Sequence, residues 1–140
     1  MIRPTRLTAA VAAAIAGLLA AACSQVTAPD VGAEKVVGTW RSSDGAELRF
    51  TADSQCDVQR IPASLLTVRP QAGVLSGRCT WKIGGESGRH RVVDVHVERW
   101  EDGSNGANFP ILIETTGGPM RLFFDVGDPD SGERYEFRKA

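Results

Sequence analysis

The chain has 140 residues, of which 42% are hydrophobic and 24% charged, with 16 basic and 17 acidic side chains. This length fits one domain with a core of its own, without need of a metal. A formal net charge of −1 lacks the excess of Lys and Arg that nucleic-acid binding requires, so we expect no nucleic-acid partner.

The first 22 residues have the organisation of a secretory signal peptide. Arg3 and Arg6 form a basic start, and an uncharged apolar stretch over residues 7–22 leads to Cys23. The stretch is shorter than the roughly 18 residues of a spanning helix. The end of this segment, Ala21-Ala22-Cys23, resembles the lipobox of bacterial lipoproteins, where lipid is attached to the cysteine sulfur and the preceding segment is removed. The resemblance implies lipidation of Cys23 and a place on the extracytoplasmic face of the cell membrane; a plain secreted protein is the alternative.

Cleavage after residue 22 leaves about 118 residues with a net charge of −3, because the removed segment holds two basic side chains and no acidic one. Residues 23–35 are small and polar, include Pro29 and Gly32, and show no apolar period, which predicts a flexible tether. From Val36 the hydrophobic period becomes two and turn residues recur. Residues 36–140 are therefore expected to form one antiparallel β domain.

Eight short strands are expected in this domain, and the segment 89–100 is the longest of them. Hairpin-length turns connect them, at 84–88 and at Asn105-Gly106 among other places, and Pro62 opens a short helical turn. Because no amphipathic helix covers a sheet face, the sheet closes on itself as a sandwich or an up-and-down barrel, and simple connectivity favours the barrel. The expected strands are 36–42, 46–52, 55–60, 77–83, 89–100, 109–115, 120–126 and 133–138.

The start of the first strand, Gly38-Thr39-Trp40, resembles the Gly-x-Trp of lipocalin-like (calycin-type) barrels, where the tryptophan closes one end, often under an arginine of the last strand. Residues 38–41 and 127–135 together resemble actinobacterial lipoproteins of similar length. The resemblance implies a small lipocalin-like barrel of about eight strands, with Gly38 and Trp40 closing it. Arg138 is out of phase with the inward residues of its strand, so it reaches Trp40 only from outside.

With Cys23 assigned to lipid, Cys56 and Cys79 remain. Both fall on apolar strand faces, and outside the membrane two such thiols are expected to form a disulfide. Two buried free thiols are the alternative. The closed loop of about 24 residues would contribute about 3 kcal/mol in the chain-entropy model.

The most concentrated polar group is Asp94, His96 and Glu98, with His90 earlier on the same face of one strand. Neighbours on one strand face lie about 7 Å apart, which is wide for ligands that sit about 2 Å from a metal ion. The valines between them are expected to face the core, so this face is expected to be solvated. We therefore predict no metal site, no catalytic residue and no cofactor.

The nine aromatic residues are expected to fill a small barrel rather than line a ligand pocket, because eight strands leave an interior just wide enough for side chains. Phe123 and Leu112 are out of phase with their inward neighbours. If exposed, they would form an apolar surface for a partner.

These observations favour a non-enzymatic, membrane-anchored binding module, whose ligand is either a small apolar molecule or an envelope protein. Two alternatives stay open. One is an inhibitor of extracellular enzymes, for which a disulfide-bonded β scaffold is suitable. The other is a metal-assisted enzyme that uses the face of Asp94, His96 and Glu98.

Overall fold

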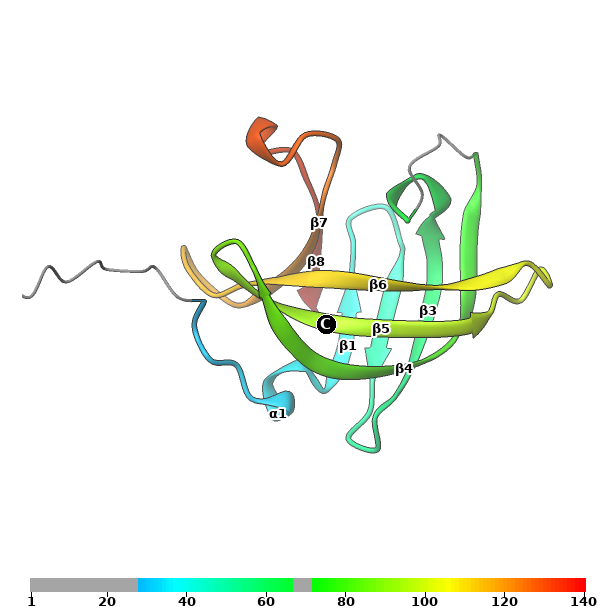
Figure 1. Cartoon of the computed structure of the whole chain (residues 1–140), viewed down its shortest axis with the longest axis horizontal. Coiled ribbons are helices and arrows are strands. Elements are labelled where there is room, and N and C mark those ends of the chain that lie inside the picture. The colour runs from blue at the N-terminus through cyan, green and yellow to red at the C-terminus, as the bar shows by residue number, and fades with distance from the viewer. Residues whose placement is uncertain (1–27, 67–71) are drawn as a thin grey trace, which may run out of the picture.

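The computed structural model describes residues 28–66 and 72–140; the expected signal peptide and Cys23 lie outside them. Eight antiparallel strands form a closed barrel in which each strand pairs with the next and β8 pairs with β1 (Figure 1). This is the up-and-down barrel expected from the sequence. The strands are β1 Gly38–Arg41, β2 Glu47–Phe50, β3 Gln55–Pro62, β4 Val74–Ser87, β5 His90–Arg99, β6 Asn105–Glu114, β7 Arg121–Asp125 and β8 Arg134–Lys139.

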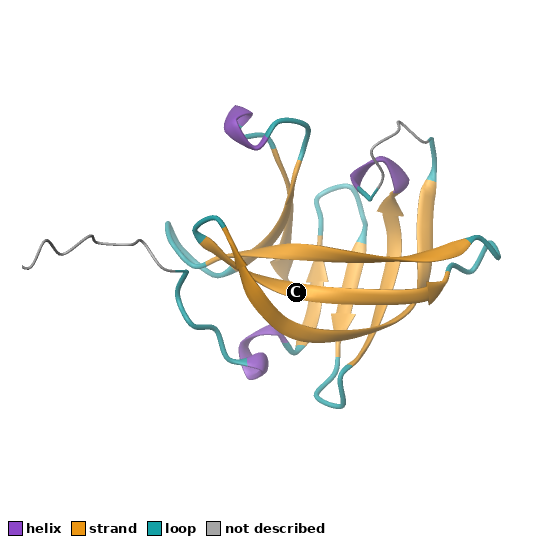
Figure 2. Ribbon diagram, in the orientation of Figure 1, coloured by secondary structure: helices purple, strands orange, loops and turns teal. Residues whose placement is uncertain are grey.

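Helix is scarce in the described residues (Figure 2). It is limited to α1 Ala33–Val36 and two short 3₁₀ turns, η1 Ala63–Leu65 and η2 Pro129–Ser131. The turn η1 follows Pro62, as the sequence predicts, since proline suits the start of a helical turn. No helix in the described segments has the length and apolar character needed to cross a bilayer.

Alternation of apolar and polar residues places the core inside the barrel. In β2, Leu48 and Phe50 are buried and Arg49 is exposed, and in β5 every second residue from Val93 to Val97 is buried. The interior is filled by large side chains with almost no exposed surface. The largest of these are Trp40, Phe50, Phe137, Leu48, Ile61, Ile111 and Leu122.

Trp40, the residue expected to close one end of the barrel, belongs to the hydrophobic core. It is fully buried, and its Nε1–H donates to the carbonyl oxygen of Val36 at 2.8 Å. The cation above the ring is Lys139, whose Nζ lies 5.4 Å from the ring centroid; Arg138 is exposed on the outside. Gly38 has φ +135°, and a Cβ there would lie 2.9 Å from Lys139 Cε. The strand therefore needs glycine at this position for its backbone conformation, whereas the flexible end of the lysine side chain can move aside.

Three expectations about the long hairpins are wrong. The longest strand is β4 with 14 residues, and it absorbs most of the loop expected at 84–88, because the glycines there sit in a register shift between Ile83 and Glu86 rather than in a turn. Asn105 and Gly106 begin β6 instead of forming a turn. A Cβ on Gly106 would lie 1.7 Å from the carbonyl oxygen of Val97, so this glycine permits close approach of β5 and β6.

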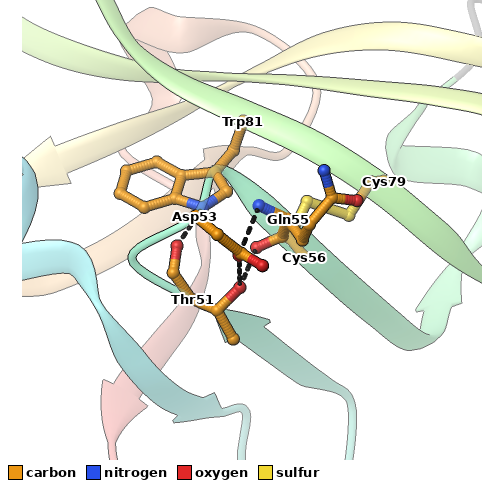
Figure 3. Close-up of a disulfide and its surroundings, with 6 residues drawn as sticks. All are labelled: Thr51, Asp53, Gln55, Cys56, Cys79 and Trp81. Carbon is orange, nitrogen blue, oxygen red and sulfur yellow. Dashed lines mark hydrogen bonds between the residues drawn. A yellow bond between two sulfur atoms is a disulfide. The ribbon is translucent and has the colours of Figure 1, made fainter.

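The disulfide prediction is confirmed (Figure 3). Cys56 on β3 is directly opposite Cys79 on β4, with a Cα–Cα distance of 4.8 Å, and the two are bonded. Beside them the Trp81 indole N–H donates to the carbonyl oxygen of Thr51 at 3.0 Å. The bridge and this bond fasten the β2–β3 turn to β4.

The described part of the expected tether is attached to the barrel. Ala28 is only 5% exposed, Val31 packs on the core, and α1 follows. Arg91 at the start of β5 makes an ion pair with Asp30 at 2.8 Å. Residues 28–36 therefore lie against the barrel.

Candidate functional site

The polar residues predicted on β5 lie on its outer face, as expected. His96 and Glu98 are exposed and Asp94 is half-buried, while the valines between them are buried. The His96 Nδ1 is hydrogen-bonded to the amide oxygen of Asn108 on β6. One ring nitrogen of His96 is therefore already committed to a neighbouring strand.

This face is part of a shallow hollow of about 570 Å³ that crosses β4, β5 and β6. Two rows of register partners across these strands line the hollow. One row consists of Thr80, His96 and Asn108, and the next of Lys82, Asp94 and Pro110. We call these six residues the outer groove. It offers a cation, a carboxylate, an imidazole and an amide on a rigid sheet, a set suited to hydrogen-bonded contact with another molecule.

The structure does not assemble these residues into a metal centre. Among residues 28–66 and 72–140, no group of three or more His, Cys, Asp or Glu lies close enough to hold a metal ion. His90 does not join His96; instead its Nε2 faces Glu114 on β6 at 3.4 Å.

Phe123 and Leu112 do not meet the condition under which they would form an exposed apolar surface. The ring is on the outer face of β7 but only 1% exposed, and Leu112 is partly buried. The Arg134 guanidinium lies 4.0 Å from the ring centroid of Phe123, and the His90 ring contacts it edge-on at 5.0 Å. The side chains of Arg134 and His90 cover the ring. The alternation of apolar and polar residues along the strand does not reveal this cover.

Glu114 organises the cover over Phe123. Its carboxylate accepts a hydrogen bond from Arg134 at 3.0 Å and faces His90. Burial raises the pKa of Glu114, but the hydrogen bond from Arg134 and the charges of His90 and Arg134 outweigh it, so the pKa is lowered overall. The carboxylate stays ionised and locks β5, β6 and β8 together on the outside.

A second polar cluster lies at the closure of the barrel. The Tyr135 hydroxyl on β8 donates to Asp44 in the β1–β2 turn, and Ser42 lies 3.0 Å from the same hydroxyl. Burial, and then the hydrogen bond to Asp44, raise the pKa of Tyr135 to about 12. The phenol is therefore a protonated structural donor and not a base.

Fold and surface together define a small, disulfide-bonded β-barrel with a packed interior and a polar outer groove. Comparisons with protein-family models, curated proteins and solved structures found no match. The likeness to actinobacterial lipoproteins stays a prediction from the sequence.

Proposed function

We propose that this protein is a lipid-anchored, non-enzymatic binding module on the extracytoplasmic face of the cell membrane. Its partner is another envelope protein, bound at the outer surface of the barrel. The observation that carries this choice of partner is the packed interior, where Trp40, Ile111 and Phe137 have no exposed surface.

A small apolar ligand is disfavoured by the same packing. Lipocalin-like barrels hold such ligands inside, but here a ligand would have to displace large side chains. Emptying the space of one buried aromatic residue costs about 3–5 kcal/mol. This cost is subtracted from the free energy of binding, so an ordinary small ligand would bind weakly inside the barrel.

The outer groove supports a protein partner. Its residues come from three adjacent strands that hold one another in register, so few degrees of freedom are lost on binding. Lys82, Asp94 and His96 provide charges and hydrogen-bonding groups of both kinds, while Pro110 provides an apolar edge. A surface with this composition recognises polar and apolar groups of a protein together.

Site-specific photo-crosslinking in intact cells tests this proposal. A crosslinking residue at Asn108 should capture an envelope protein, and Asn108 is exposed in the groove. The matched control is Arg49, an exposed position on the outer face of β2, which should capture none. An apolar molecule retained by the purified barrel in native mass spectrometry, without a crosslink at Asn108, would contradict the proposal. An extracellular enzyme that loses activity in the crosslinked complex would identify an inhibitor.

A further inference from the structure

Closure of the barrel brings three arginines side by side. Arg138 on β8 is the register partner of Arg121 on β7 and of Arg41 on β1. Each alternates with a buried inward neighbour, so all three lie on the outer face. We call Arg41, Arg121 and Arg138 the arginine row. Like charges directly opposite each other destabilise a sheet, so a row of three needs compensation.

The protein compensates the row only in part. Arg41 pairs with Glu47 at 3.1 Å while remaining 61% exposed, and Arg121 lies 3.9 Å from Glu136. Arg138 is exposed and makes no side-chain hydrogen bond or ion pair within the part of the chain that the structure describes. In those same residues the Nε of Arg121 is buried and has no partner. That buried Nε is closed to an outside ligand, but the exposed Arg138 guanidinium has unused donors for an oxyanion, and a guanidinium matches a phosphate group well.

The N-terminal segment leaves the barrel next to this row. Pro29 lines a hollow of about 440 Å³ together with Glu114 and Thr116. Glu114 is the register partner of Arg121, and Arg121 donates to the Thr116 carbonyl oxygen at 2.6 Å. Arg138 lies two strands beyond Glu114, which is about 10 Å at the usual strand spacing.

Cys23 precedes Ala28 by five residues, and five residues of extended chain span at most about 18 Å. A lipid on Cys23 therefore keeps this side of the barrel close to the bilayer surface. At that range an anionic membrane attracts basic side chains, each contributing appreciably to binding.

The turns at the strand ends remote from Arg121 and Arg138 are acidic. The β5–β6 turn over residues 100–104 and the β7–β8 turn over residues 126–133 contain five acidic residues and no basic one. An anionic membrane repels them, which favours orientations with these turns directed away from the bilayer. The acidic residues are Glu101, Asp102, Asp128, Asp130 and Glu133.

We infer that the arginine row is a membrane-contact surface that binds the phosphate groups of anionic phospholipids and orients the anchored barrel. The inference rests on the proposed function, because it requires the lipid on Cys23. The anchor supplies the high local concentration that makes a few weak charge contacts effective.

Nuclear magnetic resonance of the mature lipidated protein in bilayer discs tests the inference. Discs of phosphatidylcholine alone are compared with discs that also contain phosphatidylglycerol, and with phosphatidylcholine discs in a buffer that contains inorganic phosphate. A nitroxide on a lipid headgroup broadens the signals of residues that lie near the bilayer surface. Phosphatidylglycerol should broaden the amide signals of Arg41 and Arg138 but not those of Ser104 and Ser131. High salt should reverse the broadening.

Arg138→Gln should lower the ratio of docked to free barrel about fivefold. The matched control is Arg78→Gln, since Arg78 is exposed on β4, on the other side of the barrel, and it should change nothing. Broadening that ignores phosphatidylglycerol or survives Arg138→Gln would overturn the inference. Signal changes with inorganic phosphate but none with phosphatidylglycerol would also overturn it. The same holds if the Arg138→Gln variant loses a crosslink to a protein but keeps its contact with the membrane.

A failure of the anchor is seen separately, because the protein then does not co-elute with discs of any composition. That result would contradict the proposed function itself. Co-elution without phosphatidylglycerol-dependent broadening would contradict only the role of the arginine row.

Discussion

Single residues decide how closely the strands of this barrel approach each other. Gly106 is half-buried between β5 and β6, and the space that a Cβ would need is occupied by the Val97 carbonyl oxygen. Gly85 on β4 has no atom within 4 Å of a Cβ position. The two glycines look alike in the sequence but have different structural consequences.

Gly106→Ala should therefore destabilise the protein by about 1–3 kcal/mol, the usual cost of overpacking. Gly85→Ala is the control and should change stability by less than about 0.5 kcal/mol. Urea unfolding followed by tryptophan fluorescence measures both. Equal midpoints for the two variants would show that β5 and β6 do not approach as described.

The Tyr135 hydroxyl makes stability depend on alkaline pH. Its pKa is raised from the ordinary value near 10 to about 12, first by burial and then by the hydrogen bond to Asp44. A raised pKa means that the folded state favours the protonated phenol. Its contribution to stability is complete below pH 10 and is lost as the pH rises through 12.

Tyr135→Phe should lower stability at neutral pH and should remove this alkaline loss. The free energy of unfolding of both proteins, measured by urea titration between pH 8 and about pH 12, checks the slope. Parallel pH profiles of wild type and variant would exclude the Tyr135–Asp44 bond as its cause.

At the scale of elements, the disulfide links the β3–β4 hairpin, and the contact of Arg134 with Phe123 stabilises the β7–β8 hairpin. The Cys56–Cys79 bridge joins opposite positions of β3 and β4, with a sequence separation of 23 residues. Both cysteines belong to the core cluster. The phase of the two cysteines and their expected compartment predicted this bond, because strands joined by a short excursion pair as neighbours.

Removal of the bridge by Cys56→Ala with Cys79→Ala should lower the free energy of unfolding by about 3 kcal/mol in the chain-entropy model. This is a large part of the stability of a small domain. Thermal unfolding of the oxidised, reduced and double-variant proteins measures the loss. If a thiol reagent labels two cysteines in the oxidised protein after it is unfolded, the disulfide bond is contradicted.

At the scale of the whole molecule, the described N-terminal residues and the barrel form one folded unit. Ala28, the first described residue, is buried against the barrel, and Asp30 forms an ion pair with Arg91 on β5. The proposed lipid on Cys23, five residues before Ala28, would then limit how far the barrel moves from the membrane.

Cys23→Ser should release the protein from the membrane fraction or leave its precursor unprocessed. Two acyl chains give stable attachment where one is marginal, because each buried methylene contributes about 0.8 kcal/mol. Fractionation of cells followed by mass measurement of the mature chain checks the outcome. A variant of mature mass that stays with the membrane would contradict lipid anchoring.

The sequence by itself determined what depends on local pattern: the β class, the inward residues of β2 and β5, the Cys56–Cys79 pair and the single-file strand order. Period, turn residues and compartment are read along the chain, so these needed no tertiary information. The same reading missed the extent of β4 and the start of β6, because glycine marks turns, bulges and close approaches alike.

Only the tertiary structure decided which side chains meet across strands. The pairing of β8 with β1 creates the arginine row and places Lys139, not Arg138, over Trp40. Long side chains from β5 and β8 cover Phe123, although its phase points outward. Register and side-chain reach join residues far apart in the chain, and the contacts of β8 with β1 form only when the first and last strands close the barrel.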